Sequence, residues 1–562
     1  MDTPIVTRRT VLRAGAAAGA FLLARPTGVL AQPLGPRDAY GTSRASRLFP
    51  GSQVVHADLH NHTLLSDGAG DPGQAFASMR DAGLDVAALT DHSTVGQVVP
   101  GPFDVGGDQT PCFGSSECQS LLGIDEGAWQ RTGELADAAD TPGEFTAIRG
   151  FEWSSPTLGH MNVWFSQTWS DPLSTGGLGS IEDLVAFAEQ EGIPVDADAL
   201  GTIAELIERT PVAGLGMAGW YEWLKRPPST PAVGGGGDAL MGFNHPGREP
   251  FRFSDFAFDA GLLDRVVSLE IFNRREDYLF EVVRGRSPLV ACLDAGWRPG
   301  LLGVTDQHGT DWGFPDGLGR GGYYVDALSR EGVRAAMEER RFFATNLKGL
   351  RIDAAANGVR MGRTLGHRSG PVTIDVDVDR GPSWIGHQLV AQVLTTGPIM
   401  PEVVAAETIR VPAPGRALPR ITVDVDAADV PWLVLRLSDP SVAADDRADA
   451  TYAGFGAAIA YASPWYLDPE LALPPVTPVA GELPSDEAAV PPEPPRPRVD
   501  TPAGRLARSP RAVDVPDRGP LPVTGGGPTG PGALLLGAAA SLLALRRRQA
   551  HEEGHTHEPE GS

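Results

Sequence analysis

The chain has 562 residues, a formal net charge of −25 and a hydrophobic content of 41%. This length allows more than one folded domain, and the hydrophobic content is enough for a sizeable core. The acidic charge argues against nucleic acid and anionic lipid surfaces as partners, because both are bound through clustered Lys and Arg.

Residues 1–31 have the features of a secretory signal peptide. The stretch Thr7-Arg8-Arg9-Thr10-Val11-Leu12-Arg13 resembles the twin-arginine export motif, and an apolar run over 14–23 follows it. Val29-Leu30-Ala31 offers a small-residue cleavage site. The alternative is an N-terminal anchor helix, but the apolar run is short for a bilayer. We therefore expect an exported protein, with residues 32–50 as a linker.

From residue 51 to 346, short apolar segments alternate with helical patterns, which is typical of an α/β fold. The expected strands are 54–60, 85–90, 145–151, 161–165, 240–244, 266–271 and 301–305. The expected helices are 72–82, 181–191, 275–283 and 330–340. Two Gly-containing segments, 97–142 and 168–237, interrupt this alternation, and we interpret them as loops inserted over one end of a barrel.

Cysteine is scarce in this chain. Cys112 and Cys118 lie in a polar, Gly-containing segment, where an oxidising compartment would permit a small disulfide. Cys292 lies in an apolar run and is expected to be a buried free thiol.

Residues 347–468 show alternating polar and apolar positions broken by Gly and Pro, which predicts a small all-β sandwich. Representative strands are 372–378, 421–425 and 432–437. Residues 469–520 are rich in Pro and predict a stiff, extended linker without a core.

Residues 521–562 form a second targeting segment. Leu521-Pro522-Val523-Thr524-Gly525 resembles the LPXTG-type cell-wall sorting signal of Gram-positive bacteria, and an apolar stretch over 533–545 and three arginines at 546–548 follow it. The resemblance implies that a sortase cleaves after Thr524 and joins the chain to peptidoglycan. The chain continues beyond the arginines, so a segment that stays in the membrane is the alternative. We expect a protein anchored to the wall or tethered to the membrane on the outer face of the cell.

Histidines and carboxylates recur near the ends of the predicted strands. His60 and His62 alternate at one strand end, and Asp306 and His308 repeat this spacing at another. The full set is His60, His62, Asp67, His92, Glu152, His160, His245, Asp306 and His308. In β/α barrels the carboxyl ends of the strands form the catalytic face. A lone histidine is more often structural, but nine such positions at successive strand ends indicate a metal site.

Imidazole and carboxylate groups without thiolate suit Zn, Mn or Fe. Asp58-Leu59-His60-Asn61-His62-Thr63, together with Ser66-Asp67-Gly68, resembles the first motif of the polymerase and histidinol phosphatase (PHP) family. The later strand-end groups resemble the remaining motifs in order, so the resemblance covers about 51–346. It implies a distorted (β/α)7 barrel with two or three divalent metal ions, followed here by the predicted β-sandwich.

The resemblance implies a role for each group. His60, His62, Glu152 and Asp306 would hold a first metal ion, and Glu152 would bridge to a second one held by His160 and His245. Asp67, His92 and His308 would hold a third. Glu152, Asp306 and His308 are the expected catalytic groups. Asp58 is expected to orient a ligand imidazole from the second coordination shell.

The expected reaction is hydrolysis of a small-molecule phosphoester by a metal-bridging hydroxide. Arg248 and Arg274 follow His245 and a strand end respectively, and could bind the phosphate, although an arginine in such a place is more often a surface or ion-pair residue. Hydrolysis of carboxylic or carbamate esters on the same metal site is the alternative chemistry. A catalytically silent binding protein displayed on the wall is the alternative from another class.

Overall fold

The computed structural model describes residues 40–93, 123–155, 158–177, 179–180, 208, 211–231, 234–249, 251–313 and 317–471. The predicted signal peptide, the sorting signal, the helix expected at 181–191 and both Cys112 and Cys118 lie outside these residues. Within them, no helix is long and apolar enough to cross a lipid bilayer.

A mixed sheet forms the frame of the first half of the chain. Its strands run in the order β11-β10-β1-β2-β4-β5-β6-β7-β9. They are β1 (Gln53–Asp58), β2 (Val86–Leu89), β4 (Thr146–Ser155), β5 (Gly159–Trp164), β6 (Leu240–Phe243), β7 (Val266–Asn273), β9 (Gly300–Val304), β10 (Arg320–Val325) and β11 (Phe342–Thr345). Two short strands pair with the ends of longer ones: β3 (His92–Ser93) lies parallel to β4, and β8 (Glu276–Asp277) lies antiparallel to β7.

The direction of the strands decides where side chains meet. β1, β2 and β4 are parallel neighbours, and so are β6, β7 and β9. β5 is antiparallel to both β4 and β6, so its first residues lie beside the last residues of those strands. Beyond β1 and β9, Asn61 and Gln307 form a parallel bridge. The sheet therefore curves until β9 returns to β1, and the carboxyl ends of its parallel strands surround one site.

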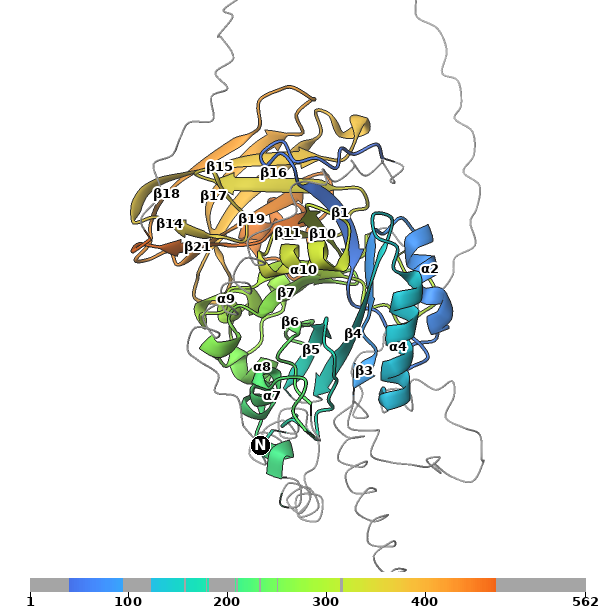
Figure 1. Ribbon diagram of the computed structural model, residues 1–562. Helices are drawn as coiled ribbons and strands as arrows, with labels where there is room; N and C mark the ends of the chain where they lie inside the picture. The colour runs from blue at the N-terminus through green and yellow to red at the C-terminus, as the bar shows by residue number, and fades with distance from the viewer. Residues whose placement is uncertain are drawn as a thin grey trace, which may run out of the picture.

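The helices of the described residues are α2 (Pro72–Asp81), α4 (Glu126–Ala139), α7 (Met217–Lys225), α8 (Arg252–Phe256), α9 (Pro288–Asp294), α10 (Arg330–Glu338) and α11 (Ala450–Ala453), with 3₁₀ turns η2 (Pro211–Gly214), η3 (Ala260–Leu262), η4 (Tyr278–Phe280) and η5 (Pro382–Trp384). Helices α2 and α4 lie side by side on the outer face of this sheet (Figure 1). Local chemistry starts the regular helices: Asp71, Asp125 and Ser329 each accept a hydrogen bond from a first-turn amide of α2, α4 and α10. α8 is a left-handed turn, because φ is positive at all five residues.

The seven predicted strands of this region and the helices at 72–82 and 330–340 are confirmed, with shifted ends. The helix predicted at 275–283 is wrong. Arg274 has a φ of 53° in a tight turn between β7 and β8, and Asp277 then caps the 3₁₀ turn η4 by accepting from Leu279. The two segments interpreted as inserted loops contain helices α4 and α7. α7 is anchored by Trp220, whose ring stacks on Trp153 with centroids 4.6 Å apart.

Apart from η5 and α11, the regular elements of residues 351–468 are β-strands, which gather at the end of the molecule opposite α7 and α8 (Figure 1). One four-stranded sheet has the order β13 (Val359–Arg360), β12 (Arg351–Ala356), β15 (Ser369–Asp379), β18 (Arg420–Asp426). The remaining strands pair with one another and reach the first sheet, because β20 pairs with β11. They are β14 (Thr364–Gly366), β16 (Gln388–Thr395), β17 (Glu402–Arg410), β19 (Trp432–Asp439), β20 (Ala457–Ala462) and β21 (Trp465–Asp468). The mixed α/β character predicted for the chain is thus confirmed, and the three representative strands fall in β15, β18 and β19.

The segment before β1 contacts both regions. Arg44 forms an ion pair with Asp85 at the start of β2, and Arg47 forms one with buried Asp377 in β15. Ser46 donates a hydrogen bond to Asp353 in β12. These contacts join the α/β region to the β-rich region.

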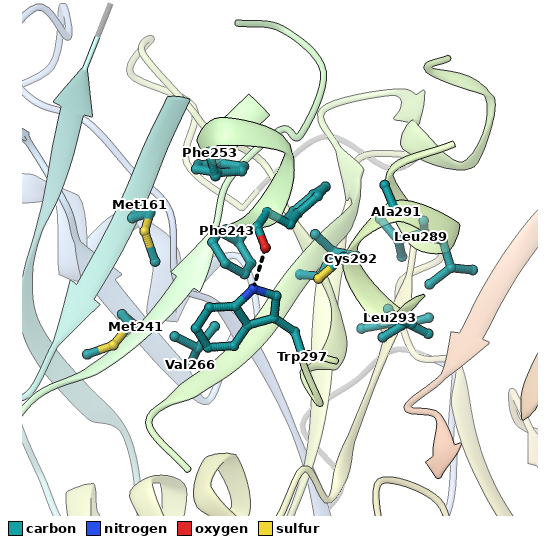
Figure 2. Packing of buried hydrophobic residues seen from close by; sticks show 14 of the residues in the cluster. Met161, Met241, Phe243, Phe253, Val266, Leu289, Ala291, Cys292, Leu293 and Trp297 are labelled. Carbon is teal, nitrogen blue, oxygen red and sulfur yellow. Dashed lines mark hydrogen bonds between the residues drawn. The ribbon is translucent and has the colours of Figure 1, made fainter. Parts of the chain in front are cut away.

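An apolar cluster packs α8 and α9 against the sheet (Figure 2). The ring of Phe243 in β6 lies 5.5 Å from that of Trp297, centroid to centroid, and the Trp297 indole N–H donates to the Phe256 carbonyl. Cys292 lies in this cluster as a buried free thiol, as predicted. The cluster packs beneath β6, and His245 follows this strand by two residues.

Candidate metal centre

The nine candidate metal-binding groups come together at the edge of the curved sheet where its parallel strands end. His60 and His62 follow β1, His245 follows β6, and Asp306 and His308 follow β9. His92 lies in β3, and His160 is the second residue of β5. Asp67 is supplied by the loop between β1 and α2. The antiparallel direction of β5 brings His160 to this edge, since its start lies beside the ends of β4 and β6.

Glu152 lies at the centre of the site, and its two carboxylate oxygens face different imidazoles. It was expected to end its strand, but β4 continues to Ser155. Oε1 lies 3.1 Å from Nε2 of His60, 3.3 Å from Nδ1 of His160 and 3.3 Å from Nε2 of His245. Oε2 lies 2.5 Å from Nδ1 of His92 and 3.7 Å from Nε2 of His62. A carboxylate divided in this way is placed to bridge two cations.

Asp67 faces a second group of imidazoles at the edge of the site. Its Oδ1 lies 3.4 Å from Nε2 of His308, 3.5 Å from Nε2 of His92 and 3.9 Å from Nδ1 of His62. The rings of His62 and His308 stack with centroids 4.0 Å apart. These four residues form one of the groups whose ligand atoms lie within 4.8 Å of one another.

Asp306 joins the imidazole cluster to two arginines. Its Oδ1 lies 3.2 Å from Nε2 of His62 and 3.5 Å from Nε2 of His60. Its Oδ2 lies 3.0 Å from Arg248 and 3.4 Å from Arg274, whose side chains are 36% and 46% exposed. Both arginines therefore lie between the buried cluster and solvent.

Oppositely charged groups of the cluster shift one another's pKa. Burial alone would raise the pKa of Glu152, but His92, His160 and His60 hold it well below the usual range. Burial would likewise raise the pKa of Asp306, yet His60 and Arg274 hold it well below. Burial opposes the charged form of His92, but Asp67 and Glu152 raise its pKa to about 9. The carboxylates of Glu152 and Asp306 are thus ionised at neutral pH.

The pKa of the His62 imidazole is lowered, whereas that of His92 is raised. Burial and the neighbouring imidazoles of His308 and His92 lower it well below the ordinary value. A buried imidazole held neutral keeps a lone pair available for a metal ion.

The donor set fits divalent metal ions. Buried imidazole nitrogens without a hydrogen-bond partner among the described residues include Nε2 of His60, both ring nitrogens of His62 and Nδ1 of His160. Such groups are costly to bury unless something binds them. Most of the nitrogen–oxygen separations lie between 3.1 and 3.9 Å. Two ligands that each bind one tetrahedral ion at ~2.1 Å lie roughly 3.4 Å apart.

The grouping of these atoms differs in detail from the one that the resemblance implied. His62 faces both Asp67 and Glu152, and His92 faces both Asp67 and Glu152 with its two nitrogens. Among the described residues, no hydrogen bond or ion pair joins the Asp58 carboxylate to an imidazole: it accepts hydrogen bonds from the hydroxyl and amide of Thr305 and from the amide of His60. The imidazole of His60 is instead held by Glu270, 2.8 Å from its Nδ1.

Glu249 and Glu270 are parts of the site that sequence reasoning missed. Glu249 lies in the loop after β6, beside His160 and His245. Glu270 lies in β7, a mostly apolar and fully buried strand, where a carboxylate was a visible signal. It also accepts from the amide of His245 and from the side chain of Asn273.

Comparisons with known proteins add little at the level of sequence. No curated protein is detectably similar to this chain. A family model described as a protein of unknown function (DUF3604) matches residues 103–178, a segment that includes Glu152 and His160.

Three solved structures resemble the chain at low identity. A two-domain protein of Bacteroides vulgatus ATCC 8482 containing a predicted PHP-like metal-dependent phosphoesterase is 14% identical, covering 76% of this chain and 99% of that one, with a TM-score of 0.33. A structure described as a metal-dependent phosphoesterase of Bifidobacterium adolescentis is 19% identical, with coverages of 47% and 90% and a TM-score of 0.23. An amidohydrolase of Chromobacterium violaceum is 14% identical, with coverages of 45% and 87% and a TM-score of 0.19.

Proposed function

We propose that this protein is a metal-dependent hydrolase that acts on phosphoesters. The observation that carries the proposal is the position of Glu152, whose two oxygens face separate sets of imidazoles supplied by different strands. Divalent ions in such a site activate water as a nucleophile at neutral pH and neutralise negative charge that develops on the substrate. His60, His160 and His245 would hold one ion with Oε1, and His62 and His92 would hold another with Oε2.

Arg248 and Arg274 support a phosphoester as the substrate. Both guanidinium groups contact Oδ2 of Asp306 and remain partly exposed, so each can bind an anionic oxygen that lies over the cluster. Guanidinium groups match phosphate geometry with two parallel hydrogen bonds. A neutral carboxylic or carbamate ester offers no comparable anionic oxygen.

The chain's own residues would orient the reaction. Asn244 donates a hydrogen bond from its side chain to Oε1 of Glu152, at 2.6 Å, which fixes the central carboxylate. Glu270 fixes the ring of His60 through Nδ1, so that Nε2 points into the site. Arg248 and Arg274 would hold the phosphate so that its ester bond faces the cluster.

We further propose the finer organisation that the sequence indicates. Residues 51–346 would be a PHP-type barrel and residues 347–468 a β-sandwich, with the Pro-rich linker as a spacer to the cell wall. The twin-arginine-like and LPXTG-type motifs support export and attachment to peptidoglycan by a sortase. Fractionation of the native host, with and without Thr524→Ala, tests attachment: the wild-type chain should resist detergent extraction from the wall, and the variant should not.

The function itself is tested by metal analysis paired with substrate turnover. The purified chain, loaded with Mn or Zn, should bind two or three ions and hydrolyse a chromogenic phosphoester faster than a carboxylester or carbamate. Glu152→Gln should abolish turnover, whereas Glu276→Gln, at an exposed position, should not. Bound metal with turnover of the neutral esters alone would favour the alternative chemistry. Absence of metal and of any turnover after reconstitution would sink the enzyme hypothesis and favour a silent binding protein.

A further inference from the structure

Glu249 is buried against two imidazoles of the proposed metal centre. Its Oε1 lies 3.7 Å from Nε2 of His160, and its Oε2 lies 3.5 Å from Nδ1 of His245. Glu249 is 8% exposed, and among the described residues its ion-pair contacts are these two rings. A buried carboxylate is costly unless charge or N–H groups compensate for its lost hydration, and the two rings are the closest groups that can do so, with Arg248 contributing from farther away.

The ring nitrogens that face Glu249 are the opposite ones from those that face Glu152. His160 presents Nδ1 to Glu152 and Nε2 to Glu249. His245 presents Nε2 to Glu152 and Nδ1 to Glu249. The two rings lie nearly perpendicular, with an interplanar angle of 74° and centroids 4.9 Å apart. One carboxylate therefore faces the outer nitrogen of both rings at once.

A neutral imidazole has one nitrogen that carries a proton and one that carries a lone pair. If the nitrogens beside Glu152 bind the metal ion, the nitrogens beside Glu249 must carry the protons. The separations of 3.5 and 3.7 Å are slightly long for hydrogen bonds, and a small rotation of each ring toward Glu249 would close them. Glu249 would then accept from both rings and fix both tautomers.

We propose that Glu249 is a positioning residue that orients His160 and His245 together for one metal ion. The proposal rests on the metal centre of the proposed function and deepens it. Glu270 does the same for a single ring, His60, at 2.8 Å, which makes it the matched comparison within the chain. A carboxylate that accepts from the second ring nitrogen of a metal-binding histidine typically contributes about 10–100-fold to metal affinity.

The loop after β6 explains how the sequence places this carboxylate. His245 accepts from the amide of Arg248 through its carbonyl, in a tight turn with His245 at φ 24° and Gly247 at φ 124°. The turn directs Arg248 toward Asp306 and Glu249 back toward His245. One short segment thus supplies a metal ligand, a substrate-binding cation and the orienting carboxylate.

The test measures metal binding by the full chain, not only activity. Mn²⁺ and Co²⁺ stoichiometry and affinity are determined for the wild type, Glu249→Gln, Glu249→Asp and Glu270→Gln, with Glu276→Gln as an exposed control. We expect Glu249→Gln to weaken the binding of one ion by 10–100-fold and to change the visible Co²⁺ spectrum, while the other ions stay bound. Glu249→Asp keeps the charge, so its metal affinity should lie between those of the wild type and Glu249→Gln. The far-ultraviolet circular dichroism of the metal-free variants should match that of the wild type.

The outcomes separate this inference from the proposed function. A wild-type chain that binds no metal overturns both. A wild-type chain that binds metal, with Glu249→Gln equal to it in stoichiometry, affinity and Co²⁺ spectrum, overturns only the role of Glu249. A wild-type chain with a fourth ion, which alone is lost in Glu249→Gln, makes Glu249 a direct ligand and overturns its positioning role.

Discussion

Asn61 and Gln307 form a parallel bridge that joins the first and last candidate metal-binding motifs, and the amide of His62 donates to the carbonyl of Gln307 at 2.9 Å. His60 and His62 lie on one strand extension, and Asp306 and His308 lie on the other. The bridge therefore sets the distance between the two His-containing motifs before any metal binds. It makes the centre a product of sheet closure, because a strand shift here would move four candidate ligands at once.

The side chain of Thr305 links the end of β9 to the end of β1. Its hydroxyl and amide donate to the buried carboxylate of Asp58, which also accepts from the amide of His60. Thr305→Val keeps the shape and removes one donor from a buried carboxylate, so we expect a loss of about 1–3 kcal/mol in the free energy of unfolding. Chemical denaturation of the metal-free chain measures it. Thr373→Val, which removes a hydroxyl from an exposed Thr pair, is the control and should cost less than about 0.5 kcal/mol.

Arg248 and Arg274 should act on the substrate more than on the fold. Removing either guanidinium with Ala deletes a charged hydrogen bond to the substrate, so kcat/KM for a phosphoester should fall by about 10–100-fold, corresponding to about 1.4–2.7 kcal/mol. Lys at either position should restore only part of this, because it loses the forked geometry. Steady-state kinetics of each variant provide the measurement, and Arg275→Ala, at the neighbouring exposed position, is the control. Equal losses for a neutral carboxylester would contradict a role in binding phosphate.

Much of the α/β region could be predicted from the sequence, since its buried strands read as apolar runs and α2 and α10 carry clear start signals. The helix predicted at 275–283 failed because its pattern could not reveal the tight turn at Arg274. The helix α7 was hidden in a segment with many glycines, and its anchor is a long-range contact of Trp220 with Trp153. Such contacts leave no local periodicity in the sequence.

The nine candidate ligands were readable because their residue types are unusual at strand ends. Their distribution around Glu152 was not, because it depends on which carboxylate oxygen each ring faces. Asp58 was expected to hold an imidazole, yet strand closure directs it to Thr305. Glu270 takes that place from β7, a strand that the sequence could not place beside His60.

Cys292 provides a probe of the core beneath β6. Its thiol is buried, and burial raises its pKa well above the ordinary value, so the reactive thiolate is strongly disfavoured in the folded chain. With residues 112 and 118 changed to Ser to leave one cysteine, a thiol reagent should react with the native protein only as fast as the protein unfolds. Cys292→Ser should cost about 1–3 kcal/mol because it buries a hydroxyl, and Cys292→Ala should cost less than that. Rapid labelling of the native chain would show that this cluster is not closed.

Asp277 should make the stability of the chain depend on pH. Burial raises the pKa of this carboxyl from 3.8 to about 6, although Arg436 and the hydroxyl of Tyr461 partly offset that effect. A raised pKa means that the folded state binds the proton more tightly than the unfolded state does. The stabilisation is therefore full below pH ~4 and is lost as the pH rises through about 6, by up to about 3 kcal/mol. The Asn side chain in Asp277→Asn keeps an oxygen that can accept from the amide of Leu279, but it has no proton to lose over this pH range. The unfolding free energy of this variant relative to the wild type should rise between pH 4 and 7 in denaturant titrations. A difference between the two that stays constant over this range would show that Asp277 titrates normally in the folded chain.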